Sequence, residues 1–174
     1  KARRWATQAR ENAPWYQHEE VGYNYRMSNV IAGVVRGQIP YLEKHIAEKK
    51  AIYERYEEGF KDLPAQMNPY NPDECEPNFW LSCMILDEEA MEITNPTEIL
   101  DTLAKYNAEG RFIWKPMHMQ PVFKNYPFVT RKEYEGKHDV GRDIFRRGLC
   151  LPSDNKITIE QQDKIIEIVK SCFK

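Results

Sequence analysis

The sequence has 174 residues, of which 41% are hydrophobic and 30% are charged. This length suffices for one compact domain with a helical extension, and this balance is typical of a folded globular protein. The net charge of −2 argues against nucleic-acid binding, which requires a clustered basic surface. No apolar run approaches the roughly 20 residues of a membrane span, and no signal peptide opens the chain. Lys1 rather than Met stands first, as expected for a piece of a longer protein.

Cysteine and histidine residues are spread along the chain without the clustered spacing of a metal site. Cys83 and Cys150 lie in apolar stretches, where a free thiol behaves as a small hydrophobic group. We therefore expect reduced, buried thiols, a cytoplasmic location and no bound metal. The residues concerned are Cys75, Cys83, Cys150, Cys172, His18, His45, His118 and His138.

Residues 1–27 are polar and rich in aromatic side chains, and they predict the end of a helix followed by a loop with extended pieces. Ser28 is the expected N-cap of a long helical region that runs toward Phe60. Pro40 must kink or divide this region because it lacks an amide hydrogen. Helical spacing of apolar residues predicts one buried face. These residues are Ile31, Val34, Val35, Ile39, Leu42 and Ile46.

The second half of the chain alternates strands and helices. Residues 64–77 are rich in Pro, Asn and Asp and predict a loop. Residues 79–86 are apolar throughout, which predicts a strand covered on both faces. Asn95 is an expected N-cap for a helix that ends near Asn107, with Gly110 as its C-terminal glycine.

The remaining elements complete an α/β domain. A short strand over 111–114 precedes an irregular aromatic loop, and a short helix is expected over 140–145. Residues 148–151 predict a buried strand, and Thr158 with Gln161 forms a capping box for the last helix. The pattern predicts a three-stranded sheet with packed helices, preceded by a long kinked helix.

Generic motifs identify no function: the chain has no G-x-G-x-x-G, no G-x-x-x-x-G-K-[ST] and no G-x-S-x-G string. Three longer strings are more specific: GYNYRMS over 22–28, WKPMHMQPVF over 114–123 and RGLCLPS over 147–153. In this order and spacing they resemble the C-terminal part of the DegT/StrS family of sugar aminotransferases. The resemblance covers nearly the whole chain. The run NFWLSC over 78–83 is most similar to the branch that aminates UDP-linked 4-keto sugars toward bacillosamine-type sugars.

The resemblance implies the aspartate-aminotransferase fold (PLP fold type I), with a large pyridoxal 5'-phosphate (PLP) domain followed by a small C-terminal domain. Family members are homodimers whose active sites lie at the subunit interface. By this likeness, residues 1–27 form the end of the large domain and a loop that acts in the partner's active site. Residues 28–63 form the connecting helix region, and residues 64–174 form the small α/β domain.

The resemblance also implies roles for particular residues. Asn24 corresponds to the asparagine that reaches the PLP phosphate of the second copy. Arg26 and His118 correspond to nucleotide-sugar contacts in that neighbouring site, and Trp114 with Phe123 is expected to form an apolar wall. An amide and a planar guanidinium both suit phosphate oxygens.

Each of these residues also has a structural interpretation. Asn24 can satisfy loop backbone, Arg26 can form a surface ion pair, and His118 can be a hydrogen-bonded structural histidine. We interpret the aromatic neighbours Tyr23, Tyr25 and Trp80 as packing residues, and Lys115 as exposed or structural.

No lysine here has the desolvated, small-residue setting of the lysine that holds PLP covalently, so the chain contains no predicted catalytic residue. The complete enzyme is expected to transfer an amino group, from glutamate, to a nucleotide-linked 4-keto sugar in polysaccharide biosynthesis. Its partners are then a second copy, a UDP-sugar and an amino-acid donor, and the chain alone is expected to be inactive. The alternatives are a sugar 3-dehydratase of the same fold, with histidine at the lysine position, and a non-catalytic α/β interaction domain.

Overall fold

The structure, a computed structural model, describes residues 1–131 and 139–174. It divides into two compact units, Lys1–Glu43 and Lys44–Lys174. The division falls inside the helical region that we interpret as the connection between two domains. His138, one of the histidines weighed as a metal ligand, lies outside the described residues.

The first unit contains a short helix α1 (Ala2–Trp5), helix α2 (Asn29–Gln38) and, between them, a segment over residues 6–28 that we call the strap. Isolated antiparallel bridges, Thr7 with Asn24 and Arg10 with His18, close the strap. The predicted N-cap is confirmed, because the Ser28 hydroxyl accepts a hydrogen bond from the Ile31 amide at 3.3 Å.

The predicted division of the long helix is also confirmed. A 3₁₀ turn over Ile39–Tyr41 contains Pro40 and separates α2 from α3 (Leu42–Phe60). The predicted buried face is wrong for α2, because no described residue covers it. The exposed apolar side chains of α2 are Val30, Ile31, Val34 and Val35, and the prediction is also wrong for Ile39 and Leu42, which are exposed beyond the end of this helix.

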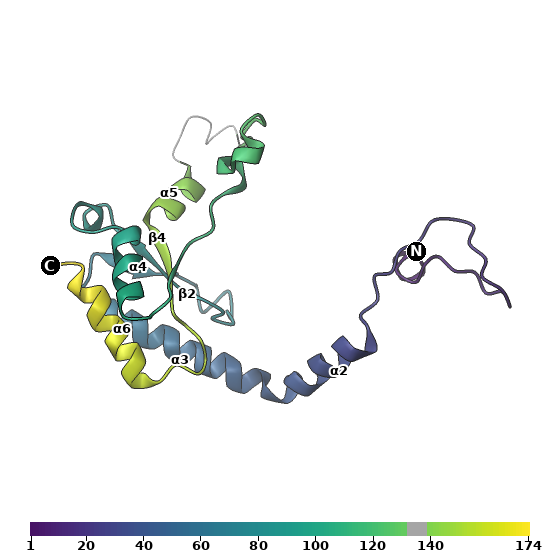
Figure 1. Cartoon of the computed structure of the whole chain (residues 1–174), viewed down its shortest axis with the longest axis horizontal. Coiled ribbons are helices and arrows are strands. Elements are labelled where there is room, and N and C mark those ends of the chain that lie inside the picture. Colours follow the sequence, from purple (N-terminus) through teal and green to yellow (C-terminus); the bar gives the residue numbers. More distant parts are fainter. Residues whose placement is uncertain (132–138) are drawn as a thin grey trace. The chain divides into compact units, whose positions relative to one another are not determined.

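The second unit contains a four-stranded antiparallel sheet of order β1-β2-β4-β3 (Figure 1). The strands are β1 (Ala65–Met67), β2 (Ser82–Leu86), β3 (Arg111–Phe112) and β4 (Gly148–Leu151). The α/β class is confirmed, but the sheet has four strands rather than three. The additional strand, β1, lies in the segment predicted as loop, because three residues are too short to show an alternating pattern.

One face of the sheet packs into the core of this unit. Along β2, Ser82, Met84 and Leu86 are buried, whereas Cys83 and Ile85 on the opposite face are partly exposed. The prediction of cover on both faces is therefore wrong for these two residues. The core side chains from the sheet are Met67, Met84, Leu86, Leu149 and Leu151.

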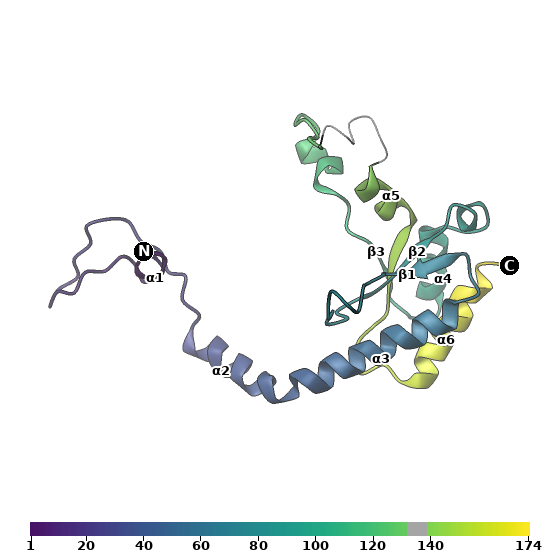
Figure 2. The same ribbon diagram turned by 180° about the vertical axis from the view of Figure 1, so that it is seen from behind.

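Three helices supply the other side of this core: α3, α4 (Pro96–Lys105) and α6 (Ile159–Ser171). They lie together beside the sheet in both views (Figures 1 and 2). Two tyrosine hydroxyls of α3 fasten loops to this core. Tyr56 donates to the Pro152 carbonyl at 2.6 Å, and Tyr53 donates to the Asn68 carbonyl at 3.0 Å. The helical members of the hydrophobic core are Ile52, Tyr53, Tyr56, Phe60, Ile99, Leu103, Ile165, Ile168 and Val169.

The predicted helix starts in this unit are confirmed. The Asn95 side chain caps α4 at 3.1 Å, and Thr158 and Gln161 form the capping box of α6. Helix α4 ends at Lys105, close to the predicted Asn107, but Gly110 is not its C-terminal glycine. The left-handed residue after α4 is Asn107, with φ of 58°. Gly110 lies in a closely packed position, where a Cβ would lie 2.6 Å from Leu100 Cδ2 and 3.0 Å from the Cys150 carbonyl oxygen.

Within the described residues, no helix is both long enough and apolar enough to cross a bilayer.

The close packing around Gly148, at the start of β4, predicts that a larger residue there lowers the free energy of unfolding. A Cβ at Gly148 would lie 2.3 Å from Ile113 Cδ1 and 2.5 Å from the Ile144 carbonyl oxygen, and a backbone atom cannot move aside cheaply. Gly148→Ala should therefore lower the free energy of unfolding by about 1–3 kcal/mol, measured by urea unfolding followed by circular dichroism.

The matched control is Gly141→Ala in the adjacent helix, where the nearest atom would lie at 3.4 Å. Alanine is the better helix former by up to about 1 kcal/mol, so this variant should be as stable as the parent or slightly more so. Equal stability of the two variants would contradict the argument.

Candidate functional site

The side-chain amide of Asn24 makes no hydrogen bond to the rest of the strap. Its neighbours hold the backbone: the Tyr23 amide donates to the Trp5 carbonyl at 2.7 Å, and the Tyr25 amide donates to the Ala6 carbonyl at 3.1 Å. The Asn24 side chain is exposed and has no hydrogen-bond partner among the described residues. The loop is thus satisfied without this amide, which is available to a ligand or partner beyond these residues.

A close backbone approach fixes the path of the strap. A Cβ at Gly22 would lie 2.1 Å from the carbonyl carbon of Gln8 and 2.3 Å from the amide nitrogen of Ala9. Gln8 and Ala9 themselves have positive φ, 68° and 50°. Only glycine fits at position 22 without displacing this backbone, and Asn24 follows two residues later.

Arg26 lies on the same segment and is exposed. It forms no ion pair with any described residue, so the surface-pair interpretation has no partner in this part of the chain. An amide and a guanidinium two residues apart, both without a side-chain partner among the described residues, suit an anionic group.

His118 is held by a carboxylate rather than pointing freely to solvent. Its Nε2 lies 2.6 Å from Oδ2 of Asp139, and both side chains are about one-fifth exposed. The imidazole also packs on Phe128, with ring centroids 4.1 Å apart. His118 lies in the 3₁₀ turn Met117–Met119, so this contact ties the aromatic loop to the residue that begins the next helix.

The contact decides which imidazole nitrogen remains for a ligand. Since Nε2 faces a carboxylate, it carries the hydrogen, and in the neutral ring Nδ1 is then an acceptor. Nδ1 has no partner among the described residues. A neutral His118 therefore accepts a hydrogen bond from a hydroxyl, and a protonated one donates to a phosphate. The ring lines a hollow of about 390 Å³ with Met117, Phe123, Tyr126 and Pro127.

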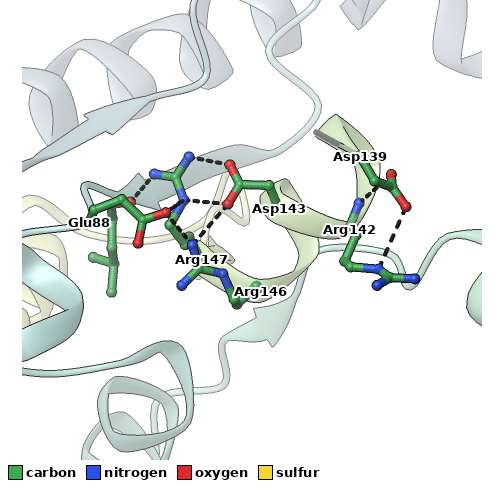
Figure 3. A network of polar contacts seen from close by, with 7 residues as sticks. Glu88, Asp139, Arg142, Asp143, Arg146 and Arg147 are labelled. Atoms are coloured by element: carbon green, nitrogen blue, oxygen red, sulfur yellow. Dashed lines mark hydrogen bonds and ion pairs between the residues drawn. The ribbon is translucent and has the colours of Figure 1, made fainter. Parts of the chain in front are cut away.

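Asp139 is the N-cap of α5 (Val140–Arg147), and its Oδ1 accepts from the Arg142 amide at 3.0 Å (Figure 3). The helix extends two residues beyond the predicted 140–145. Hydrogen bonding from the Arg142 amide holds the pKa of Asp139 below its ordinary value, and the His118 contact acts in the same direction.

The far end of α5 is anchored by a cluster of ion pairs (Figure 3). Asp143 is 7% exposed and accepts from Arg147 Nε at 2.9 Å and from Arg146 Nη2 at 3.1 Å. Arg146 also pairs with Glu88, and Arg147 donates to the Leu86 carbonyl at the end of β2. Sequence reasoning missed this cluster, whose only signal is the spacing of acid and base on one helix face.

Trp114 packs against Trp80 in a tilted arrangement and shares no wall with Phe123. The two indole rings have centroids 5.8 Å apart at 34°, and their side chains are 62% and 64% exposed. They line a hollow of about 410 Å³ together with Lys49, Arg111 and Cys150. Phe123 lines the other hollow, beside His118.

Trp80 was interpreted as a packing residue, and a local turn explains its exposure. The Trp80 amide donates to the Asn78 side chain at 3.1 Å, and Phe79 adopts a φ of 51°. This turn buries Phe79 and leaves Trp80 outside, so β2 begins at Ser82 rather than at Phe79. The signal available in the sequence was an asparagine two residues before the indole, as in Asx turns.

The predicted site residues belong to different units: Asn24 and Arg26 to the first, Trp114 and His118 to the second. Lys115 is exposed. Within the described parts of the chain, no three His, Cys, Asp or Glu side chains are grouped as metal ligands.

The chain belongs to the DegT/DnrJ/EryC1/StrS aminotransferase family, whose model matches residues 2–170. A relative in Bacillus subtilis, EpsN, named as a pyridoxal phosphate-dependent aminotransferase, is 38% identical over 99% of this chain and 43% of its own length. The GDP-perosamine synthase of Escherichia coli O157:H7 is 27% identical over 91% of this chain and 40% of its own.

Solved structures show the same fold. The PMP form of Spr1654 of Streptococcus pneumoniae, named as a sugar aminotransferase, superposes with a TM-score of 0.82 at 20% identity, covering 98% of this chain and 41% of that one. A PLP form of the same protein matches with a TM-score of 0.80. The family resemblance is confirmed, and the chain spans about two-fifths of the length of these relatives.

The hydrogen bonds of Asp139 with the Arg142 amide and with His118 predict how the stability of the fold depends on pH. The pKa of Asp139 is lowered in the folded state, so its ionised form stabilises the fold above the ordinary aspartate pKa. That contribution is lost as pH falls through the lowered value. Asp139→Asn keeps a capping oxygen but not the charge. The difference in free energy of unfolding between the parent and this variant should therefore shrink from pH 7 to pH 3.

Asp139→Ala, which also removes the cap, is the companion variant and should be less stable than Asp139→Asn at every pH. Urea midpoints at several pH values measure both effects. A parent–variant difference that does not change with pH would contradict the assignment.

Proposed function

We propose that the complete protein is a PLP-dependent aminotransferase that transfers an amino group, from glutamate, to a nucleotide-linked 4-keto sugar, and that this chain supplies the C-terminal part of its active site. Membership of the family and the PLP and PMP forms of a solved relative support the reaction and the cofactor. The observation that carries the proposal is the exposed Asn24 side-chain amide, held on a constrained strap with no hydrogen-bond partner among the described residues.

Asn24 acts on the PLP phosphate of a second copy in this proposal. A neutral amide donates to a phosphate oxygen whatever the pH, and Arg26, two residues on, adds a forked cation for the nucleotide sugar. The exposed apolar face of α2 supports association, because a stripe of four large apolar side chains in water favours burial against another surface.

His118 and Trp114 contact the sugar nucleotide in the same proposal. With Asp139 on Nε2, the free Nδ1 of His118 accepts from a sugar hydroxyl, or donates to the diphosphate when the ring is protonated. The exposed indole of Trp114 offers a flat apolar face beside Trp80. PLP, when bound, supplies the electron sink, and these side chains bind and orient the substrate.

The nucleotide and the cellular role are part of the proposal. The NFWLSC run favours a UDP-linked sugar, whereas several relatives are named as GDP-perosamine synthases. A relative named for spore coat polysaccharide biosynthesis supports a role in polysaccharide synthesis, for which we propose a cytoplasmic enzyme.

Removing the Asn24 amide tests the cofactor contact. In the complete protein, Asn24→Ala should weaken PLP binding by about 10- to 150-fold, which corresponds to the roughly 1.5–3 kcal/mol of one hydrogen bond to a charged group. Fluorescence titration of the apoprotein with PLP measures the dissociation constant.

The matched control is Gln66→Ala, which removes an exposed amide from β1 in the other unit and should leave PLP affinity unchanged. Unaltered affinity of Asn24→Ala would contradict the proposal and favour a non-catalytic interaction domain.

A second prediction concerns the aminotransferase activity of the isolated chain. Because the sequence motifs predict that the covalent PLP lysine lies outside this chain, the 174-residue chain supplied with PLP, glutamate and a UDP-4-keto sugar should form no amino sugar. The complete protein should form it under the same conditions, as followed by mass spectrometry of the sugar nucleotide. Turnover by the isolated chain would show that one of its own lysines serves.

A further inference from the structure

Two thiols face each other across the central strands of the sheet. The register of β2 and β4 pairs Cys83 directly with Cys150, and their sulfur atoms lie 3.6 Å apart. The residues are 67 positions apart in the chain, so sheet formation alone brings them together.

The backbone hydrogen bonds on either side show whether Cys83 and Cys150 form a hydrogen-bonded or a non-hydrogen-bonded antiparallel pair. The Cys83 amide donates to the Asn68 side chain, and its carbonyl accepts from the Asn68 amide, each at 2.9 Å. Both polar groups of Cys83 thus point toward β1 and away from β4. The Gly148 carbonyl accepts from Ile113 on the β3 side at 3.5 Å, and Cys150, two residues on, has the same orientation.

Cys83 and Cys150 therefore form a non-hydrogen-bonded antiparallel pair. In such pairs the Cα atoms are about 4.5 Å apart and the side chains are close together. A disulfide accepts Cα separations of about 4.4–6.8 Å with sulfurs about 2.0 Å apart. The sulfurs would approach by rotation of the two side chains, on a backbone that is already paired.

The surroundings shift the pKa values of the two thiols in opposite directions. Hydrogen bonding from the Cys83 thiol, with a smaller effect of the Arg111 charge, lowers the pKa of Cys150, while the same contact and burial raise that of Cys83. Cys150 also lines the hollow below the two indole rings, which gives a small reagent a route to it. The thiolate is the reactive form of cysteine, so the attacking sulfur is that of Cys150.

We propose that Cys83 and Cys150 form a site of reversible oxidation, which closes to an intramolecular disulfide when the protein meets a peroxide. The Cys150 thiolate attacks one peroxide oxygen, the O–O bond breaks, hydroxide leaves and a sulfenic acid forms. The Cys83 sulfur then attacks that sulfenic sulfur, its proton passes to the leaving oxygen, and water departs. In total, two thiols and hydrogen peroxide give one disulfide and two waters. This inference does not rest on the proposed function.

The test uses the complete protein, treated with hydrogen peroxide and then blocked with iodoacetamide. Mass spectrometry of the unreduced digest should show a Cys83–Cys150 linked peptide that has lost two hydrogens and disappears on treatment with dithiothreitol. The cross-link should also raise the melting temperature by about 5–15 °C, because it closes a long loop.

Exposed Cys75 is the internal control. Its oxidation shows that the peroxide dose was effective, and it should form no link to either strand. In Cys75→Ser the Cys83–Cys150 link should persist, and in Cys83→Ser the Cys150 sulfenic acid should instead be trapped by dimedone.

Oxidised Cys75 with unlinked, alkylated Cys83 and Cys150 would overturn the proposal, as would links between protein copies in place of the internal one. Because the parent protein carries the main readout, poor folding of a variant leaves the test intact.

Discussion

The antiparallel pairing of β2 with β4 is the constraint on which the second unit depends. It joins segments more than 60 residues apart and places Met84, Leu86, Leu149 and Leu151 on one face, where three helices bury them. Such long-range pairing is entropically costly until the apolar face is covered. The Tyr56 bond to Pro152 fastens α3 to the chain directly after β4, so core and strand pairing support each other.

The candidate binding residues lie where this regular framework ends. Trp80 precedes β2, and Trp114 and the His118 loop follow β3. Helix α5 connects this loop to the sheet. At the start of the helix Asp139 contacts His118, and at its end Arg147 donates to the carbonyl of Leu86, the last residue of β2. Residues presented by loops are thus positioned by rigid elements.

Local chemistry made much of the fold predictable from the sequence. Ser28, Asn95 and Thr158 begin helices because their side-chain oxygens bond to amides that a helix leaves unsatisfied, and Pro40 divides a helix because it has no amide to donate. Prediction failed where tertiary contacts decide: the three residues of β1 pair only because β2 lies beside them, and Gly110 serves close packing rather than a helix end.

The site was predictable to a smaller extent. Motif likeness indicated Asn24, Arg26, Trp114 and His118, but composition and periodicity carry no information on which atoms face each other. The Asp139 partner of His118 lies 21 residues away, and the thiol pair of Cys83 and Cys150 follows from register, which a single sequence does not reveal.

The exposure of α2 has a consequence for how the first unit becomes ordered. Among its described residues, Ala9 alone is a buried hydrophobic side chain, so this unit has almost no apolar core to offset the entropy of fixing its backbone. Its shape is held by backbone hydrogen bonds, such as that from the Tyr23 amide to the Trp5 carbonyl, rather than by packed side chains. In the association proposed above, covering the apolar face of α2 would therefore also stabilise the strap around Asn24.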